Sequence, residues 1–242
     1  MGLMRNMLRI VLKAGGLKVI NDKPIPSAVM HHQIDVLLDV GANQGQYVRK
    51  LRELGYRGKI ISFEPLPAAY ETLSELAKDD PLWTIHPRCA VGSALGETEI
   101  NVSKNSYSSS ILPIMKTHID AAANAAYVGR AKVDVITLDS VFSQYCKPGD
   151  KIFLKIDTQG FEGEVLKGAT KVLPNMSVVQ LEMSIVPLYE GQRLYDYFFD
   201  FFKEQGFFLW ALERGFYDPI SGQNLQFDAT FVRNDLAQTP LL

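Results

Sequence analysis

The sequence predicts an α/β fold built on a mostly parallel sheet with helices on both faces. Three observations predict this fold. Short apolar runs of strand length alternate with helical segments along most of the 242 residues. The first run leads into a helix through a glycine-containing turn at Gly41, and the second run ends at an acid, Glu64. Ligands of such sheets bind at the carboxyl ends of the strands, so we expect the functional residues there.

The first part of the chain has a regular strand–helix rhythm. Helices are indicated by apolar residues at helical spacing after the first strand and again after Pro65. Gly55 then closes the first of these helices. The predicted strands are Ile34–Val40, Lys59–Phe63 and Trp83–His86; the apolar helix positions are Tyr47, Val48, Leu51 and Leu54, then Tyr70, Leu73 and Leu76.

The rhythm breaks after the third strand and then returns. We interpret residues from about 96 to 145 as a small inserted β/α segment, with a Ser-rich loop at Ser106–Ser110. Its predicted elements are strands at Glu97–Val102 and Val133–Leu138 and an Ala-rich helix at Asp120–Tyr127. The elements predicted after it are a strand at Ile152–Ile156, a helix at Val165–Val172, a strand at Ser177–Leu181, a helix at Leu194–Lys203, and an antiparallel pair at Phe207–Leu212 and Leu225–Arg233.

Composition limits the classes of function. The chain has 25 Lys and Arg against 27 Asp and Glu, so it lacks the basic excess typical of nucleic-acid binding. Its two cysteines, Cys89 and Cys146, are too few for a disulfide framework or a zinc cluster, and we therefore expect a cytoplasmic protein. No apolar run has the length of about 18 residues that a membrane span needs.

We interpret residues 31–236 as a single domain that includes the insertion. Residues 1–30 are predicted to form an amphipathic helix and a lead-in, and residues 237–242 a tail. The apolar side of this helix could either dock on the body of the protein or make weak contact with the inner membrane surface through residues 1–15. The charges that recur every fourth residue are Arg5, Arg9 and Lys13, and the opposite apolar stripe is Met4, Met7, Leu8 and Val11.

The turn after the first strand has the spacing G-x-x-x-G, with glycines at Gly41 and Gly45. The first glycine permits a tight turn and close approach of a ligand, and the second permits close packing of helix on strand. A dinucleotide fingerprint would carry a middle glycine where this chain has Asn43, and Asp39 adds a negative charge beside the turn. Both features suit a ligand with an ammonium and a carboxylate, such as S-adenosylmethionine, better than a pyrophosphate; an ordinary βα turn is the alternative.

Glu64 strengthens the interpretation of a nucleoside site. It stands at the carboxyl end of the second strand, where an acid can accept two hydrogen bonds from a ribose diol. Both NAD and S-adenosylmethionine carry that diol, so Glu64 does not choose between them. The alternative is a surface acid that caps the following helix. In this architecture the loop after the third strand, with Cys89 and Ala90, flanks the adenine.

A second group of polar residues ends the strand at Ile152–Ile156. Lys155 and Asp157 share one face of it, and charges there are costly unless they are paired or functional. Glu162 opens the next helix and Glu182 ends the next strand, so several acids meet at one rim. A buried ion pair that holds the strand end is the alternative. These acids lack a dense D-x-D-type spacing, so we predict no metal, although oxygen ligands for a hard cation are present.

These motifs resemble those of the FkbM-type S-adenosylmethionine-dependent methyltransferases, in order, from about Asp35 to Arg233. The family often has Glu where this chain has Gln159. The resemblance implies a seven-stranded, Rossmann-like sheet whose last strand is antiparallel, and O-methylation of a hydroxyl on a sugar, glycolipid or polyketide-type product. The runs that carry it are Asp39-Val40-Gly41-Ala42-Asn43-Gln44-Gly45, Phe63-Glu64-Pro65, Ser109-Ser110, Leu154 to Glu162 and Glu182-Met183-Ser184. The cofactor-binding residues expected from the motifs are Asp39, Gly41, Ala42, Asn43, Gly45, Tyr47, Glu64, Pro65, Cys89, Ala90, Ser110 and Asp157.

The resulting hypothesis is an O-methyltransferase with a small-molecule or glycolipid acceptor and no nucleic-acid partner; assembly as a homo-oligomer is left open. A base must remove the proton of the acceptor hydroxyl. Asp157 is the first candidate, Lys155 or Glu182 the second, and His118 in the insertion the last. Two alternatives are an NAD(P)-dependent oxidoreductase and a non-catalytic scaffold that keeps a nucleoside pocket.

Overall fold

The computed structural model describes residues 26–236. The amphipathic helix predicted for residues 1–15, its membrane contact and the tail at residues 237–242 lie outside the described residues. Within residues 26–236, no helix combines the length and the apolar character that crossing a bilayer requires.

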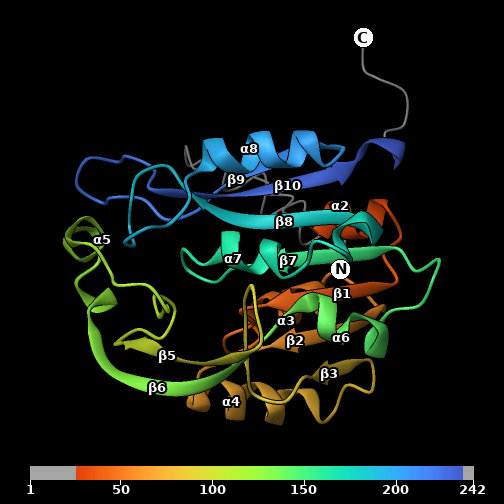
Figure 1. Ribbon diagram of the computed structural model, residues 1–242, viewed down its shortest axis with the longest axis horizontal. Helices are drawn as coiled ribbons and strands as arrows, with labels where there is room; N and C mark the ends of the chain where they lie inside the picture. Colours follow the sequence, from red (N-terminus) through yellow and green to blue (C-terminus); the bar gives the residue numbers. More distant parts are fainter. Residues whose placement is uncertain (1–25, 237–242) are drawn as a thin grey trace, which may run out of the picture.

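The main sheet has seven strands in the order β3-β2-β1-β7-β8-β10-β9 (Figure 1). Strands β3, β2, β1, β7 and β8 pair in parallel, whereas β10 runs antiparallel to both β8 and β9. The α/β class, the mostly parallel sheet and the antiparallel last strand are therefore confirmed. The bounds are β1 Val36–Val40, β2 Lys59–Phe63, β3 Trp83–Ile85, β7 Ile152–Ile156, β8 Met176–Ser184, β9 Phe207–Arg214 and β10 Gln226–Arg233.

Helices cover both faces of this sheet because its central strands are apolar on both sides. Successive side chains of a strand point to opposite faces. Leu37 of β1 packs in one core with Val48 and Leu51 of α3, and the adjacent Leu38 packs in the other core with Val165 and Phe198. The helices are α2 Pro26–His31, α3 Gln46–Glu53, α4 Pro67–Ala77, α6 Leu138–Tyr145, α7 Glu162–Lys167 and α8 Tyr195–Glu204.

The segment between β3 and β7 builds a second, three-stranded sheet in the order β4-β6-β5. Its strands are β4 Ala90–Val91, β5 Gly96–Ser103 and β6 Tyr127–Ile136, with β5 antiparallel and β4 parallel to β6. Figure 1 shows β5 and β6 curving along one end of the main sheet. This curved sheet and its long loop form one wall of the cavity described below.

Two predictions within this segment are wrong in position. The Ala-rich helix predicted for Asp120–Tyr127 is a helix α5 at Lys116–Ala121 and a 3-10 turn at Ala123–Ala125. The helix stops because Ala122 is extended, with φ −149° and ψ 91°. The strand predicted for Val133–Leu138 is longer and ends at Ile136, because Thr137 caps α6 by accepting a hydrogen bond from the Ser140 N–H.

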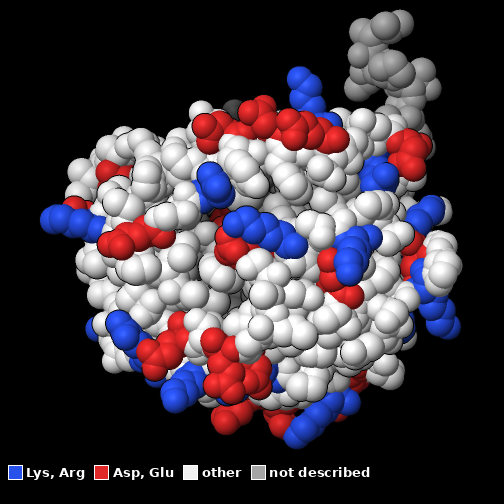
Figure 2. Space-filling view, viewed as in Figure 1, with Lys and Arg blue, Asp and Glu red and all other residues white. Residues whose placement is uncertain are grey.

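The spacing of apolar residues in helix α8 determines which side of the helix faces the core. Phe198 and Phe202 are buried in the core, at helical spacing. The exposed side carries Asp196, Asp200 and Glu204, and Figure 2 shows acidic side chains gathered along this edge. Elsewhere on the face that Figure 2 shows, acidic and basic side chains are interspersed.

Candidate active site

Close packing requires glycine at two positions of the turn between β1 and α3. Gly41 has φ +79°, and a Cβ there would lie 1.9 Å from the backbone oxygen of Asp157. Gly45 has φ +77°, and a Cβ there would lie 2.7 Å from the ring of Trp83. Both conformations are strained for residues with a side chain. Gly41 therefore lets the end of β1 approach the end of β7, and Gly45 lets α3 approach β3.

Glu64 is held at the end of β2 by backbone N–H groups. Its Oε2 accepts a hydrogen bond from the Asn43 N–H at 2.7 Å, and its Oε1 accepts one from the Leu66 N–H at 2.8 Å. Burial raises the pKa of Glu64 to about 7, against the opposing effect of these two hydrogen bonds. Each carboxylate oxygen still has a lone pair for a further donor.

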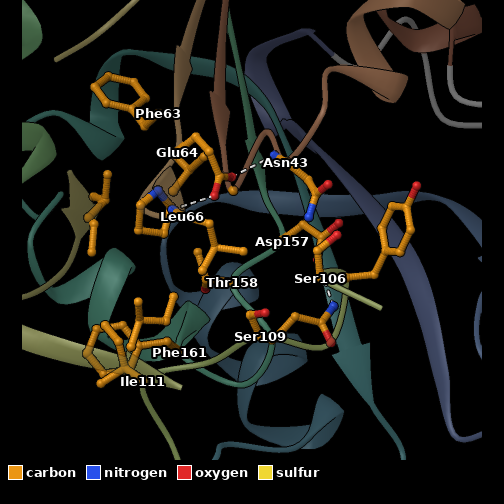
Figure 3. Close-up of a pocket in the computed structure, with 18 of the residues that line it drawn as sticks. Asn43, Phe63, Glu64, Leu66, Ser106, Ser109, Ile111, Asp157, Thr158 and Phe161 are labelled. Carbon is orange, nitrogen blue, oxygen red and sulfur yellow. Dashed lines mark hydrogen bonds between the residues drawn. The ribbon is translucent and has the colours of Figure 1, made fainter. Parts of the chain in front are cut away.

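A cavity, called here the main cavity, opens over the ends of β1, β2, β4 and β7 (Figure 3). Its polar side chains include Asn43, Glu64, Asp157, Ser106 and Ser109, and they share one space with a larger apolar lining. An apolar slot with a few placed polar groups is typical of a site for a planar, partly polar ligand. The apolar lining residues are Val40, Phe63, Pro65, Leu66, Cys89, Ala90, Val91, Ile100, Ile111 and Phe161.

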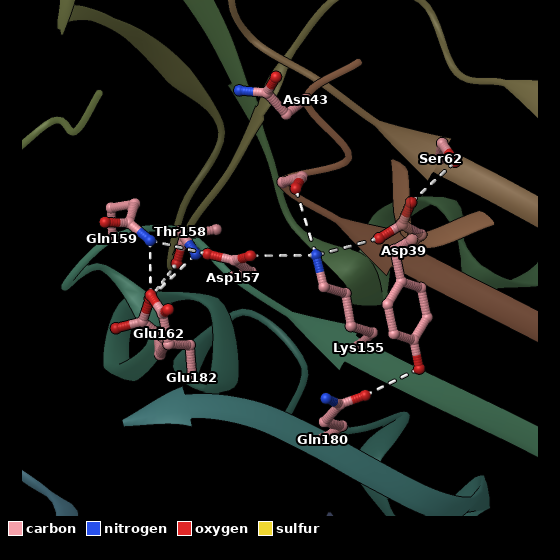
Figure 4. A network of polar contacts seen from close by, with 12 residues as sticks. Asp39, Asn43, Ser62, Lys155, Asp157, Thr158, Gln159, Glu162, Gln180 and Glu182 are labelled. Carbon is pink, nitrogen blue, oxygen red and sulfur yellow. Dashed lines mark hydrogen bonds and ion pairs between the residues drawn. The ribbon is translucent and has the colours of Figure 1, made fainter. Parts of the chain in front are cut away.

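Next to the main cavity, Lys155 joins two carboxylates on one face of the sheet (Figure 4). Its Nζ lies 3.4 Å from Asp39 Oδ1 and 3.3 Å from Asp157 Oδ2. Burial alone would lower the pKa of Lys155, but Asp157 and Asp39 raise it above its usual value. Burial raises the pKa of Asp39, and Lys155 and Ser62 oppose that rise. Lys155 therefore keeps its proton and balances the buried negative charge.

Gln159 connects Asp157 to a second acid, Glu182. Its Nε2 donates to Asp157 Oδ1 at 2.9 Å and to Glu182 Oε2 at 2.5 Å. The Tyr189 hydroxyl donates to Gln159 Oε1 at 2.7 Å, and this contact fixes the orientation of the amide. Gln159 adopts φ 56°, an unusual value for a residue with a side chain. Burial, followed by the charge of Asp157, raises the pKa of Glu182 well above its usual value.

Glu162 has a structural place in the turn after β7. Its Oε1 accepts hydrogen bonds from the N–H groups of Thr158 and Gly160 and from the Thr158 hydroxyl, at 2.9, 3.1 and 3.1 Å. The carboxyl is buried, and burial raises its pKa to about 7. The acid closes the turn that carries Asp157 and Gln159 and does not line the main cavity.

A second space, called here the α3 pocket, lies between helix α3 and the ends of β7 to β10. Tyr47 forms part of it and donates its hydroxyl hydrogen to Gln180 Oε1 at 2.8 Å. Burial, followed by the charge of Asp157, raises the pKa of Asp228 to about 7. The lining residues are Gln46, Tyr47, Lys50, Leu51, Lys155, Asp157, Gln180, Glu213 and Asp228.

Many of the residues predicted to hold a cofactor come together. Those that line the main cavity are Gly41, Asn43, Glu64, Pro65, Cys89, Ala90 and Asp157. Those that do not line it are Asp39, Ala42, Gly45, Tyr47 and Ser110. Asp39 is fully buried and faces Lys155, not the cavity. The Ser110 hydroxyl donates to the Gln159 backbone oxygen at 2.7 Å, so it fastens the Ser-rich loop to the turn after β7.

The fold brings three of the four candidate catalytic residues together and places His118 apart. Asp157 and Glu182 line the main cavity, and Lys155 lies beside it in the α3 pocket. His118 lines neither space and packs its ring against Tyr189 and Phe216. Burial lowers the pKa of His118 to about 4, so its imidazole is neutral at physiological pH.

Sequence reasoning missed several residues of the site. Gln159 was noted only for differing from Glu, although its place between two acids on neighbouring strand ends could have predicted a bridge. Ser106, Ile111 and Phe161 line the main cavity, but two of them come from the insertion loop, whose fold placement no local pattern encodes. Asp228 comes from the antiparallel strand β10, and its nearness to β8 follows only from the strand register.

The match to known proteins identifies the family. The model of the Methyltransferase FkbM domain matches residues 39–209. The chain belongs to the FkbM methyltransferase family. Methyltransferases of this family use S-adenosylmethionine, which agrees with a main cavity that offers a carboxylate for a diol and an apolar slot for a base. Within residues 26–236, no group of three or more His, Cys, Asp or Glu side chains could hold a metal ion.

Three curated relatives have informative names. The chain is 30% identical over 153 residues to "Methyltransferase sdnD" of Sordaria araneosa, covering 54% of this chain and 59% of that protein. It is 28% identical over 193 residues to "2-O-methyltransferase NoeI" of Sinorhizobium fredii, covering 70% and 75%. It is 27% identical over 149 residues to "Hexuronic acid methyltransferase AglP" of Haloferax volcanii, covering 62% and 56%. The matched part thus spans less than two thirds of sdnD and of AglP.

Proposed function

We propose that this protein transfers a methyl group from S-adenosylmethionine to a hydroxyl of a sugar, glycolipid or polyketide-type acceptor. The names of NoeI and AglP, a 2-O-methyltransferase and a hexuronic acid methyltransferase, support an oxygen acceptor on a sugar. The observation that carries the proposal is the position of Asp157. Its carboxylate is partly exposed, with 31% of the side chain accessible, and it lines both the main cavity and the α3 pocket.

Asp157 is the proposed general base. A carboxylate that is exposed to both spaces can orient an acceptor hydroxyl and take its proton. Lys155 and Gln159 each bind one oxygen of this carboxylate and so fix its plane. Neither Lys155, which keeps its proton, nor Glu182, whose raised pKa favours the neutral acid, is suited to accept a proton at neutral pH.

The other features of the site have binding roles in this proposal. Glu64 would accept hydrogen bonds from the ribose diol, and the apolar slot beside Cys89 and Phe161 would hold the adenine. Bound S-adenosylmethionine supplies an electrophilic methyl group on a positively charged sulfur. The carboxylates around Lys155 give the cavity rim a net negative character that favours such a cation.

Two measurements test the proposal against its alternatives. Isothermal titration calorimetry compares S-adenosylhomocysteine with NAD, and we expect binding of the first alone. Labelled S-adenosylmethionine is then incubated with the protein and a panel of glycosides, glycolipids and polyketides, and we expect label in an alkali-stable methyl ether. Binding of NAD alone would indicate an oxidoreductase. Binding of S-adenosylhomocysteine with no transfer to any acceptor would indicate a non-catalytic scaffold.

A further inference from the structure

Three acids that line the main cavity stand in one row across the sheet. Strand register aligns positions in β2, β1, β7 and β8, and Glu64, Asp157 and Glu182 each come one residue after an aligned position. Two strands lie between β2 and β8, so the backbones at Glu64 and Glu182 are about 14 Å apart. The nucleoside of a cofactor bound at Glu64 therefore occupies one end of the cavity, and the part above β7 and β8 is available to the acceptor.

The Ser-rich loop, Ser106–Ser110, is attached to this second end of the cavity. The Ser110 hydroxyl donates to the backbone oxygen of Gln159, in the turn after β7, at 2.7 Å. Just past the loop, the backbone oxygen of Pro113 accepts a hydrogen bond at 2.9 Å from the N–H of Glu190, in the segment after β8. The loop is therefore joined to both strands that carry the second end of the cavity.

Hydrogen bonds within the loop fix the shape of its backbone. Asn105 Oδ1 accepts from the Ser108 N–H at 3.0 Å and from the Ser103 hydroxyl at 2.8 Å. The Ser109 hydroxyl oxygen accepts from the Ser103 N–H at 3.0 Å. Ser106 adopts φ 62°, a left-handed conformation that persists only where the surrounding structure holds it. The backbone between Ser106 and Ser108 is therefore held in place without a ligand.

Tyr107 is the exposed residue of this loop. Its side chain is 53% exposed, whereas Ser108, Ser109 and Ser110 are buried, which reverses the usual distribution of aromatic and small polar residues. Tyr107 lines the main cavity, and within residues 26–236 its side chain makes no hydrogen bond and no contact with another aromatic ring. Figure 3 shows the neighbouring Ser106 on the side of the cavity where Asp157 lies, opposite Phe63. The ring of Tyr107 is thus available to a ligand.

We propose that Tyr107 binds the methyl acceptor, and that this acceptor is a pyranoside whose ring packs its C–H face on the ring of Tyr107. This inference rests on the proposed O-methyltransferase function and names its acceptor class. The axial C–H bonds of a pyranose give the sugar an apolar face, and a tyrosine ring offers a large apolar surface with few rotatable bonds. The loop holds the backbone of Tyr107 in advance, so binding has to order only the side chain.

Polar side chains in the same cavity suit the hydroxyls at the edge of a sugar ring. Ser106 and Gln46 line the main cavity, and within residues 26–236 neither side chain makes a hydrogen bond. Each can donate and accept, as a sugar hydroxyl can. A planar aromatic polyketide would also pack on a tyrosine ring, but it carries few hydroxyls along its edge. An exposed aromatic ring together with uncommitted polar side chains therefore favours a sugar.

The test measures binding to the protein loaded with S-adenosylhomocysteine, which removes any need for turnover. Saturation-transfer NMR gives the dissociation constants of the methyl glycosides of glucose, galactose and mannose, of the acyclic polyol glucitol, and of naphthol. Glucitol has the hydroxyls of a sugar without a ring face, and naphthol has a flat ring face with a single hydroxyl. Tyr107→Ala removes the aromatic ring, and Tyr107→Phe keeps it. The control is Tyr217→Ala, because Tyr217 is exposed and lines neither the main cavity nor the α3 pocket.

We expect the wild-type protein to bind at least one methyl glycoside about tenfold more tightly than glucitol or naphthol, a difference of about 1.4 kcal/mol. Tyr107→Ala should weaken that binding by about fivefold to tenfold, and Tyr107→Phe and Tyr217→Ala should keep it within about twofold. The axial protons on one face of the glycoside should shift upfield over the aromatic ring in wild type and Tyr107→Phe, but not in Tyr107→Ala. The affinity for S-adenosylhomocysteine, measured by calorimetry, should stay within about twofold in all variants.

Four results would overturn the inference. No glycoside binds; Tyr107→Ala leaves glycoside affinity and the upfield shift unchanged; naphthol binds more tightly than every glycoside, which would indicate an aromatic acceptor; or Tyr107→Ala loses S-adenosylhomocysteine affinity, which would assign Tyr107 to the methyl donor. The proposed function fails separately: glycosides would bind with the expected dependence on Tyr107, yet none would receive a labelled methyl group. Conversely, methyl transfer to a glycoside that is insensitive to Tyr107→Ala would retain the function and reject the role of Tyr107.

Discussion

The two spaces on either side of Asp157 share Gln46 and Asp157 but are otherwise lined by different elements. The main cavity has an apolar lining from β2, β4 and the insertion, with Glu64 as its buried acid. The residues that line the α3 pocket come from α3 and β7 to β10, and all of them except Leu51 carry a polar group. One edge of the sheet can therefore provide two different sites, because the two spaces have only Gln46 and Asp157 in common.

Both spaces contain buried acids, and different groups stabilise them in each space. Buried carboxylates are unfavourable unless they are paired or hydrogen-bonded. In the main cavity, two backbone N–H groups satisfy Glu64. Gln159, which also lines the main cavity, donates to both Asp157 and Glu182. In the α3 pocket, Lys155 pairs with Asp39 and Asp157, and Gln180 interacts with Asp228. A single substitution at Lys155 or Gln159 therefore affects two acids at once.

The largest expected effect is a loss of kcat without a loss of cofactor affinity when Asp157, which lines both spaces, is replaced. Asp157→Asn keeps the shape of the side chain but removes the proposed base, so kcat should fall by about 10²–10⁴-fold. Affinity for S-adenosylhomocysteine should change by about threefold or less, because the amide oxygen still accepts hydrogen bonds. Steady-state kinetics and calorimetry provide the two measurements.

Asp196→Asn on the exposed side of α8 is the matched control and should leave both quantities unchanged. Equal losses of kcat and of S-adenosylhomocysteine affinity in Asp157→Asn would make Asp157 a binding residue of the main cavity. The boundary between the two spaces would then carry no catalytic group.

The second prediction tests how closely the two halves of the sheet are joined. Gly41→Ala places a Cβ against the Asp157 backbone oxygen in addition to its strained φ, so the free energy of unfolding should fall by more than about 3 kcal/mol. Gly55→Ala has a similar positive φ of +99° but nothing within 4 Å, and should cost about 1 kcal/mol. Urea unfolding of both variants measures the difference. Equal costs would mean that close approach of β1 and β7 is unimportant.

The two halves also differ in how far the sequence could predict them. The β2 bounds Lys59–Phe63, the glycine turn and Glu64 follow from local rules: an apolar run, a turn residue and an acid after a strand. Local pattern also indicated Asp157, since a charge at the end of an apolar strand is unusual. Of these residues, Gly41, Phe63, Glu64 and Asp157 do line the main cavity.

The α3 pocket could not be predicted in the same way. Asp228 and Glu213 are ordinary acids in the sequence, and only the antiparallel register of β10 with β8 and β9 brings them into one pocket with Gln180. A shift of one residue in that register would turn both acids to the other face. The short strand β4 and helix α6 were missed for a related reason, because long-range pairing and capping, and not length or periodicity, define them.

The third prediction changes the amide that links the two acids. Gln159→Glu removes the two hydrogen bonds that Gln159 donates to Asp157 and Glu182 and places a second carboxylate against Asp157, so kcat at neutral pH should fall by roughly 10–100-fold. An added negative charge also disfavours an ionised base, so the pH of half-maximal kcat should rise. The pH–rate profile of the variant measures both effects.

Tyr189→Phe is the matched control for orientation alone. It removes the hydroxyl that donates to Gln159 Oε1 but adds no charge, so kcat should fall less and the pH profile should not move. A pH profile that is unchanged in Gln159→Glu would show that this amide does not act on the base.

The smallest expected effect concerns the main cavity and has a definite sign. Burial raises the pKa of Glu64 to about 7, and a ribose diol donates to the ionised form. The ionised fraction rises from about one tenth at pH 6 to about nine tenths at pH 8, so S-adenosylhomocysteine should bind up to about tenfold more tightly at pH 8. Calorimetry across this range measures the change, and Glu64→Gln should bind more weakly with no such dependence.

The raised pKa of Glu64 makes the ligand-free protein less stable as the pH rises, whereas it makes cofactor binding tighter. The unfolded chain loses the Glu64 proton near its ordinary value of 4.5, whereas the folded protein holds it to about 7. Stability from this group is therefore fully present below 4.5 and is lost as the pH rises to about 7. Glu162 and Asp228, whose pKa values are also raised to about 7 by burial, act in the same direction.

S-adenosylhomocysteine should thus stabilise the protein against urea most strongly at the pH where the ligand-free protein is least stable. A stabilisation that instead decreases between pH 6 and 8 would exclude ionised Glu64 as the acceptor of the diol.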